Sequence, residues 1–271
     1  MPEISIIMGV YNTKNLNMLE NSIDSILQQS FEDFEFIICD DGSEKNIVDF
    51  LKQVAEKDKR IIILENEKNI GLAGTLNRCI EISRGRYIFR QDDDDFSEPD
   101  RLKHQYEYLE KHSDISILGS NISLYDDTGK WGKLKYPHEP KKEDFLFMVP
   151  FMHGALAFRK ESLVSAGSYL SSKETKRTED YELLMRMYSL GFKGCNLQDE
   201  LYNFREDIFA QKRRKYRYKI DEARIRYRGF KMLNMLPKGI PYIIKPLIVG
   251  IIPYTLLNLM KDIYYKRKTN M

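Results

Sequence analysis

The chain has 271 residues, of which 42% are hydrophobic and 31% are charged, and its formal net charge is +2. This composition excludes an intrinsically disordered protein, and the length is sufficient for one large or two small domains. The three widely spaced cysteines, Cys39, Cys79 and Cys195, exclude a disulfide framework and are typical of a reducing cytoplasm. Because no basic and apolar leader pattern follows Met1, we expect no secretory signal peptide.

The charge is unevenly distributed along the chain. From Gln211 to the end there are 16 Lys and Arg residues and three Asp and Glu residues, a net charge of +13, so the first 210 residues carry −11. A basic tail on an acidic body indicates an anionic surface as the partner of the tail.

The first ninety residues alternate between short apolar runs and apolar residues at helical spacing. The predicted strands cover residues 4–8, 34–39, 60–64 and 87–90. The predicted helices cover residues 16–27, 47–54 and 72–80. Such alternation with short connections is typical of an α/β fold, in which a parallel sheet has helices on both faces.

A polar loop follows each of these four strands. The loops contain Asn12, then Asp40-Asp41, then Asn69-Ile70-Gly71, and then Asp92-Asp93-Asp94-Asp95. Ligands of parallel sheets bind beyond the carboxyl ends of the strands, so we expect these loops to converge on one edge. Four adjacent carboxylates repel one another, whereas a divalent cation binds them. The alternative is a solvated acidic turn, and the convergence of the loops favours a metal and nucleotide site.

Beyond Pro99 the alternation ends, and we expect mixed strands. The predicted elements are a helix at residues 100–111 and strands at residues 115–119, 122–125, 131–136, 155–158, 192–197 and 201–205. A short helix is predicted from Arg159, and an amphipathic helix follows Thr178. Glu179 and Asp180 begin that second helix, where they either compensate its dipole or belong to a functional site; both roles can coexist.

The basic tail contains two further patterns. Residues 209–235 have the spacing of a long helix, and residues 240–260 are mostly apolar. Pro241, Pro246, Pro253 and Lys245 argue against a single straight membrane-spanning helix in the apolar segment. We favour a segment that lies in the membrane interface and is attracted to anionic lipid. The alternative is a helical pair packed on the domain or on a second copy of the chain.

Several motifs together resemble the family 2 glycosyltransferases of the inverting, nucleotide-sugar-dependent kind. They occur in the family's order as Ser5 to Asn12, Asp40-Asp41-Gly42-Ser43, Asn69-Ile70-Gly71, Arg90 to Asp95 with Pro99-Asp100-Arg101-Leu102, and Glu179-Asp180. The resemblance implies the GT-A (Rossmann-like) architecture, a mostly parallel sheet flanked by helices, in residues 1–208. Residues 1–98 would form the nucleotide-binding half and residues 99–208 the acceptor half, followed by a helical, membrane-associating extension over residues 209–271.

The resemblance implies roles for residues in the first three polar loops. Val10, Tyr11 and Asn12 match the backbone that lines the nucleotide base pocket. Asp41 matches the carboxylate that accepts a hydrogen bond from the base N–H, while Asp40 either assists or holds the turn. The loop at Asn69 matches the one that closes over the base.

The aspartate run resembles the family's metal and ribose motif. Asp94 matches the direct metal ligand, with Asp92 as a second metal candidate. Asp92 or Asp93 would bind the ribose hydroxyls, and Asp95 would support them from behind. Four aspartates where the motif needs three positions leave the register open by one residue.

In the second half, Asp180 falls on the position of the catalytic base, and Glu179 precedes it. His153 lies where related enzymes place a residue near the diphosphate or the acceptor, or it is a structural histidine. Arg205 either neutralises the leaving diphosphate or pairs with a carboxylate.

The reaction implied by the resemblance is inverting transfer of a sugar from a nucleotide-diphosphate sugar, with a UDP-sugar favoured, to an acceptor hydroxyl. Mg²⁺ or Mn²⁺ would be the cofactor. The sequence entering the tail, Tyr202-Asn203-Phe204-Arg205, resembles bacterial members that build capsular or other surface polysaccharides. The expected partners are a saccharide or lipid-linked saccharide, the inner face of the cell membrane, to which a cytoplasmic enzyme would bind peripherally, and a second copy of the chain as a homodimer; no nucleic acid is expected.

Three alternatives remain at this point. A sugar-phosphate nucleotidylyltransferase needs a Gly-rich, basic phosphate loop after the first strand, but residues 9–14 contain one glycine. A nucleic-acid-binding protein could use Tyr216, Tyr218 and Tyr227 as stacking surfaces in the basic tail, which leaves residues 240–260 without a role. A catalytically idle sugar-nucleotide binder has no use for Asp180.

Overall fold

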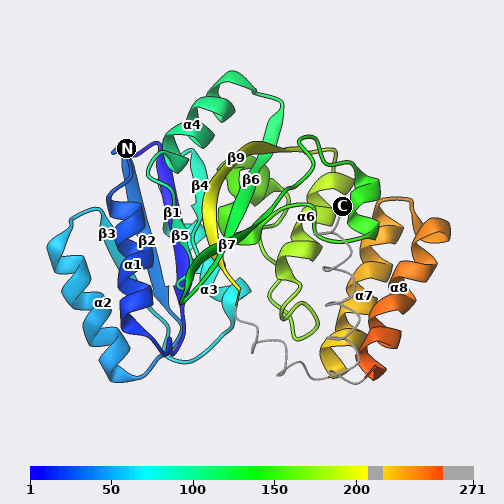
Figure 1. Ribbon diagram of the computed structural model, residues 1–271, viewed down its shortest axis with the longest axis horizontal. Helices are drawn as coiled ribbons and strands as arrows, with labels where there is room; N and C mark the ends of the chain where they lie inside the picture. Colours follow the sequence, from blue (N-terminus) through cyan, green and yellow to red (C-terminus); the bar gives the residue numbers. More distant parts are fainter. Residues whose placement is uncertain (207–215, 253–271) are drawn as a thin grey trace.

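The computed structural model describes residues 1–206 and 216–252, and it contains a mixed sheet flanked by helices (Figure 1). The strands are β1 (Ile4–Val10), β2 (Phe34–Asp40), β3 (Ile61–Glu65), β4 (Tyr87–Arg90), β5 (Phe96–Ser97), β6 (Ile115–Asp126), β7 (Gly129–Leu134), β8 (Ala157–Arg159) and β9 (Lys193–Arg205). The helices are α1 (Leu16–Leu27), α2 (Lys45–Lys57), α3 (Leu72–Ile82), α4 (Arg101–Lys111), α5 (Lys160–Ser165), α6 (Glu179–Ser189), α7 (Tyr216–Met232) and α8 (Leu236–Ile251), with 3₁₀ turns η1 (Lys142–Leu146) and η2 (His153–Ala155).

The strand order of the sheet is β3-β2-β1-β4-β8-β6-β9-β5, and β7 pairs with β6 at the side of this path. Strand β1 lies between β2 and β4, and β2 pairs with β3; all of these pairs are parallel. Strand β8 then runs antiparallel to both β4 and β6. The carboxyl ends of β1 to β4 therefore share one edge, which carries the four polar loops. The α/β prediction for the first half of the chain is confirmed.

Alternation of side chains along the strands supplies a core on each face of the sheet. Ile6 and Met8 of β1 pack with the helices α1, α2 and α4 on one face, whereas Ile7 between them packs with α3 on the other. Helix α1 begins where the side chain of Asn15 accepts hydrogen bonds from the amides of Asn17 and Met18. The two cores hold the polar edge of the sheet rigidly between them.

Two pairs of predicted strands are single long strands. Residues 115–119 and 122–125 both belong to β6, and residues 192–197 and 201–205 both belong to β9. The polar stretch within β6 remains extended because Asn121 donates to the carbonyl of Gln198 and accepts from the amide of Tyr136. The register between β6 and β9 shifts on both sides of Asn121. The two-residue strand β5 was not predicted.

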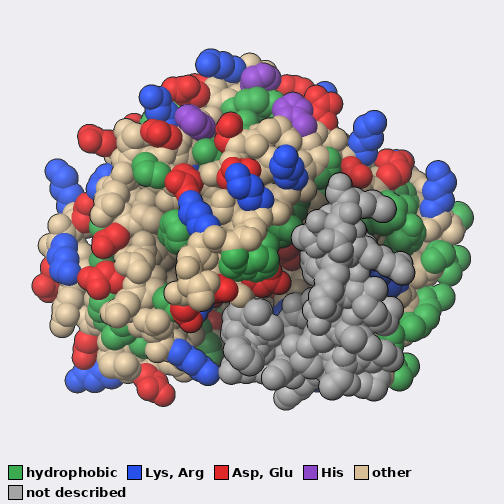
Figure 2. Space-filling model, viewed as in Figure 1, with side chains coloured by type: hydrophobic (Ala, Val, Ile, Leu, Met, Phe, Trp, Pro, Cys, Tyr) green, Lys and Arg blue, Asp and Glu red, His purple; other side chains and the backbone are tan. Residues whose placement is uncertain are grey.

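The C-terminal helices form a pair that packs on the domain. Helix α7 packs against α6, and α8 packs against α7, where Gly239 lies on the buried ring of Phe230. Helix α8 continues through Pro241 and Pro246, and its outer side carries exposed hydrophobic side chains along the right-hand edge of the molecule (Figure 2). In residues 1–206 and 216–252 no helix is long and apolar enough to cross a membrane. The parts of the tail predictions at residues 209–215 and 253–260 lie outside the described residues.

Candidate active site

A pocket of about 240 Å³ lies at the carboxyl ends of β1 and β2. Its wall is formed by Gly9, Val10, Tyr11, Asp41, Asn69, Gly71, Leu72, Thr75 and Lys176. The side chain of Val10 is buried, whereas Tyr11 is half exposed. The structure thus brings together the residues of the first three polar loops, and an aromatic ring at the rim offers a flat face to a planar ligand.

The carboxylate of Asp41 holds the loop that closes one side of this pocket. One oxygen accepts hydrogen bonds from the amide of Ile70 at 2.8 Å and from the side chain of Asn66 at 2.7 Å, and the other accepts from the amide of Gly71 at 2.9 Å. The backbone of Gly71 has φ +83°, a conformation that favours glycine. Asp41 therefore lines the pocket while it fixes the loop at Asn69.

Asp40 and Asn12 stabilise the neighbouring turns. One oxygen of the buried Asp40 carboxylate accepts from the amides of Gly42 and Ser43, each at 3.0 Å. Asn12 has φ +45°, and its side chain accepts from the amide of Glu44 at 2.8 Å, which ties the first loop to the second. Asp40 therefore holds the turn, as one of its two expected roles requires; its other expected role, assisting Asp41, stays a prediction.

A second cavity, of about 550 Å³, continues the cleft toward α6. It shares Asn69, Gly71 and Lys176 with the first pocket and extends to Glu179. Lys173, Lys176 and Arg177 also line the cavity, and the guanidinium of Arg177 lies 5.1 Å from the ring centre of Tyr218 in α7. These cations were not predicted as site residues. The basic run that directly precedes Glu179-Asp180 is the sequence signal that identifies them.

The four aspartates have different environments. Asp94 is exposed, Asp92 and Asp93 are partly buried, and Asp95 is fully buried. One carboxylate oxygen of Asp95 accepts the amide of Arg205 at 2.7 Å, which ties the aspartate loop to β9. Asp95 is therefore the buried residue that supports the loop, while Asp92 to Asp94 are at least partly accessible to solvent.

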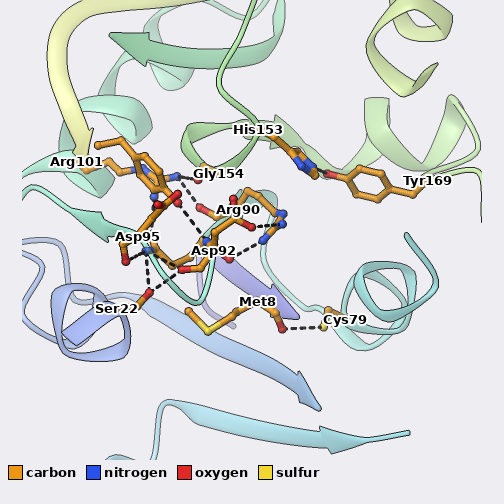
Figure 3. Close-up of polar contacts among 12 residues, drawn as sticks. Met8, Ser22, Cys79, Arg90, Asp92, Asp95, Arg101, His153, Gly154 and Tyr169 are labelled. Carbon is orange, nitrogen blue, oxygen red and sulfur yellow. Dashed lines mark hydrogen bonds and ion pairs between the residues drawn. The ribbon is translucent and has the colours of Figure 1, made fainter. Parts of the chain in front are cut away.

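Arg90, at the end of β4, lies beside Asp92 of this loop (Figure 3). Its buried guanidinium donates to Asp92 with a distance of 2.5 Å between Nη2 and Oδ1. Burial lowers the pKa of Arg90, but Asp92, with smaller contributions from Tyr169 and Tyr202, more than offsets this effect, so the guanidinium stays charged. No role was predicted for Arg90, although an arginine at the end of an apolar strand is a visible signal.

The unpaired carboxylates of the loop carry raised pKa values. Burial, followed by the charges of Asp94 and Asp92, raises the pKa of Asp93 to about 7. Although Asp94 as a residue is exposed, desolvation of its carboxyl group by the surrounding protein, followed by the charge of Asp92, raises its pKa to about 6. Within the two described segments, no group of three or more His, Cys, Asp and Glu side chains could enclose a metal ion. Mg²⁺ needs only one or two protein carboxylates when phosphate and water supply the rest, so the excess negative charge at Asp92 and Asp94 fits such an open site.

Asp180 is placed by the first turn of α6. Burial, then the adjacent Glu179 and then Asp92 raise its pKa to about 7. No hydrogen bond joins its carboxylate to another side chain in the described parts of the chain. Glu179 is more deeply buried, and burial raises its pKa as well. Asp180 is thus a half-buried carboxylate with a pKa near neutrality, next to Glu179, which lines the second cavity.

His153 and Arg205 have partners within the protein. The Nε2 atom of His153 lies 2.8 Å from the hydroxyl of Tyr169, and burial together with Arg90 lowers the pKa of the imidazole to about 3 (Figure 3). The guanidinium of Arg205 pairs with Asp127 at 2.8 Å. In the structure His153 thus has a partner within the protein, and Arg205 pairs with a carboxylate. A role of either residue near the diphosphate stays a prediction.

Gly154 allows the turn η2 to pass over the aspartate loop. A Cβ atom at this position would lie 2.7 Å from Oδ2 of Asp92 and would also collide with the hydroxyl of Tyr202. The buried guanidinium of Arg101 donates to the carbonyls of Arg90 at 2.7 Å and of Gly154 at 3.2 Å. Sequence reasoning assigned no role to Gly154, because the contact joins segments more than fifty residues apart.

A sequence model of Glycosyl transferase family 2 matches residues 5–166. The chain belongs to this family. The putative glycosyltransferase EpsE of Bacillus subtilis is 38% identical over 95% of this chain and 92% of the relative. The amylovoran biosynthesis glycosyltransferase AmsE of Erwinia amylovora is 31% identical over 82% of this chain and 83% of the relative. The family expected from the motifs is confirmed.

Solved structures agree with this family 2 glycosyltransferase in fold. Staphylococcus aureus TarS in complex with UDP-GlcNAc superposes with a TM-score of 0.71 at 15% identity, covering 90% of this chain and 73% of TarS. The mannosyltransferase PcManGT of Pyrobaculum calidifontis, in complex with GDP-Man and Mn²⁺, has a TM-score of 0.63 at 16% identity, with coverage of 96% and 79%. These likenesses confirm the GT-A fold.

Proposed function

We propose that the protein transfers a sugar from a nucleotide-diphosphate sugar to a saccharide hydroxyl, with inversion, during synthesis of a surface polysaccharide. One observation carries the proposal: the polar loops at one edge of the sheet form a base-sized pocket whose cleft continues to Glu179, the neighbour of the near-neutral Asp180, and the aspartate loop follows β4 at the same edge. The amylovoran relative supports a polysaccharide pathway, and the two complexes support a nucleotide-sugar donor. Family membership favours this function over the nucleotidylyltransferase and nucleic-acid alternatives.

The donor would lie along the cleft from the first pocket to α6. Its base would stack against Tyr11 and approach Asp41, with the loop at Asn69 beside it. Asp92 and Asp93 would bind the ribose hydroxyls. Among the titratable side chains that line the first pocket, Lys176 is the cation, and it would approach the diphosphate. A UDP-sugar remains our preferred donor.

We propose Asp94, assisted by Asp92, as the site of Mg²⁺ or Mn²⁺. When bound there, the cation would act as a Lewis acid that stabilises the charge of the leaving diphosphate. The buried Arg90 would hold the Asp92 side chain in place through their ion pair. The Mn²⁺ in the PcManGT complex supports this class of ion.

Asp180 would act as the general base. An acceptor hydroxyl becomes a competent nucleophile when its proton is removed during attack, and a base with a pKa near the working pH does this best. The raised pKa of Asp180 meets that requirement. The acceptor oxygen would attack the anomeric carbon on the face opposite to the diphosphate, Asp180 would take the proton, and the diphosphate would leave with the bonding electrons.

We propose that the acceptor is a saccharide carried on a lipid and that the enzyme works at the cytoplasmic face of the membrane. We also retain the division into a nucleotide-binding half over residues 1–98, an acceptor half over residues 99–208 and an extension over residues 209–271.

Thermal denaturation with UDP, GDP and dTDP, each with Mg²⁺, Mn²⁺ or EDTA, tests the donor site. We expect one diphosphate to raise the melting temperature, and to do so more strongly with a divalent ion than with EDTA. Asp180→Asn should retain this shift and lose transfer of sugar. A variant with near-normal turnover would contradict the assignment of the base, and the absence of any nucleotide effect would contradict the site.

A further inference from the structure

The outer side of α8 is an exposed apolar ridge. Ile240, Ile244, Ile248 and Ile251 recur at intervals of four, four and three residues, which places them on one side of the helix. Their exposed fractions lie between 44% and 73%. Figure 2 shows hydrophobic side chains at the edge of the molecule where Figure 1 places α8. A helix whose outer side faced only water would carry polar residues here.

The inner side of α8 is already used for packing, so the ridge is not a displaced core face. Gly239 lies against Phe230 of α7, Pro246 is buried, and Ile243 packs against the main core. Helix α8 is therefore apolar on both its inner and its outer side, and the rest of the protein covers only the inner side.

The charges beside the ridge indicate what covers the other side. The 16 residues of α8 include no Asp or Glu, and its two cations, Lys238 and Lys245, are both exposed and lie two turns apart at one margin of the ridge. Beyond them, Tyr242 contacts the exposed ring of Phe147, with 5.1 Å between ring centres. The surface thus combines apolar side chains with lysines whose stems can extend toward phosphate groups.

These charges favour a lipid surface over a second copy of the chain. A two-fold dimer brings the same surface of both copies together, so the lysines of one α8 would lie near those of the other. An anionic bilayer instead offers acyl chains to the isoleucines and phosphates to the lysines. The net charge of +13 from Gln211 to the end of the chain also favours attraction to an anionic bilayer.

We propose that α8 lies in the interface of an anionic membrane, with the isoleucine ridge inserted among the acyl chains and Lys238 and Lys245 at the headgroups. This surface deepens the proposed location of the enzyme and is independent of its chemistry. Helix α7 packs against both α6 and α8, and Asp180 is the second residue of α6 (Figure 1). Two helix spacings of about 10 Å place the axis of α8 roughly 20 Å from that of α6, so the proposed membrane contact lies on the same side of the molecule as the helix that carries the base.

Sedimentation with vesicles tests the proposal on the full-length protein. We expect binding to vesicles of phosphatidylglycerol and phosphatidylcholine, and much weaker binding to phosphatidylcholine alone. The double variant Ile244→Glu, Ile248→Glu should bind roughly tenfold or more weakly. Lys238→Gln and Lys245→Gln should each weaken binding by about fivefold. Leu190→Glu is the matched control, because Leu190 is 57% exposed and Ile248 is 58% exposed, but Leu190 follows α6.

Three results would overturn the proposal. The first is failure of the wild-type protein to bind the phosphatidylglycerol vesicles. The second is equal binding by the double isoleucine variant. The third is a dimer that the same variant converts to a monomer in lipid-free sedimentation, while its vesicle binding is unchanged. The thermal shift of the same samples with UDP reports separately on the nucleotide site, so failure of membrane binding and failure of the proposed function are distinguishable.

Discussion

Arg90 and Asp92 form an ion pair between the end of β4 and the aspartate loop, with 2.5 Å between Nη2 and Oδ1. The arginine side chain is 1% exposed and that of the aspartate 27%. A positive charge is thereby fixed next to the aspartate loop, and its position is set by the end of β4. The pair joins the rigid sheet to the loop that carries the proposed metal ligand.

Removal of this cation should destabilise the fold. Arg90→Gln leaves Asp92 without its partner in a partly buried place, and we expect a loss of about 3 kcal/mol in the free energy of unfolding. Arg90→Lys, which retains the positive charge, should lose less of the free energy of unfolding than Arg90→Gln. Urea denaturation measures both. Arg205→Gln, which breaks the pair with the exposed Asp127, is the control and should cost less than about 1 kcal/mol. Equal losses in the two variants would contradict the proposed importance of the buried pair.

The pH dependence of transfer should follow Asp180. Its pKa of about 7 means that the basic form decreases about tenfold for each pH unit below that value. We therefore expect kcat/KM to rise with pH up to about 7 and then level off. Initial rates measured across this range, with stability checked at each pH, provide the test. A plateau that already begins near the ordinary carboxyl pKa of 3.8 would contradict the raised pKa of Asp180.

Asp180→Asn should be more stable than the wild-type protein at neutral pH. The folded-state pKa is raised, so the wild-type protein loses stability as the pH rises from 3.8 to about 7, and the loss is constant above that. The amide does not ionise and avoids this cost, which we place at about 1–3 kcal/mol for a partly buried carboxyl. Thermal unfolding of both proteins at several pH values measures the difference. A stability advantage of Asp180→Asn that decreased with rising pH would contradict the raised pKa of Asp180.

Gly154→Ala should disturb the site directly. The added methyl group would meet Asp92 and Tyr202, and neither the turn η2 nor β4 can move without breaking the bonds from Arg101. We expect a loss of about 1–3 kcal/mol in stability together with weaker nucleotide binding, measured by denaturation and calorimetry. Gly132→Ala in β7 is the control, because its nearest neighbours are atoms of the flexible Leu124 side chain. Unchanged nucleotide affinity in Gly154→Ala would separate the turn from the site.

Asp94 and Asp95 should respond differently to substitution. Asp94→Ala removes an exposed carboxylate, so the fold should be little changed while the metal-dependent part of nucleotide binding is lost. Asp95→Ala removes the acceptor of the Arg205 amide and should cost about 2 kcal/mol. Calorimetry with and without Mn²⁺, combined with urea denaturation, distinguishes the two effects. A reversal of the two patterns would shift the register of the motif by one residue.

The first half of the fold was predictable because its information is local. Each of the strands β1 to β4 is an apolar run with a polar loop behind it, and parallel pairing brings those loops together. The long strand β6 was not predictable, since the partners of Asn121 are Tyr136 and Gln198, which are distant in the sequence. Four identical aspartates carry no information about which of them is buried, so the support role of Asp95 needed the structure. The same is true of Asp41, whose loop partners Ile70 and Gly71 lie about thirty residues away.

The segment before α6 has a consequence for the extent of the catalytic unit. Arg177 lies over Tyr218, and Glu174 pairs with Arg228 at 2.7 Å, so α7 holds the loop that forms one wall of the cleft. A chain shortened at residue 208 would keep every proposed catalytic residue and still lose the support of that wall. The C-terminal extension therefore supports one wall of the cleft, and a membrane contact on α8 would be only one helix away from that support.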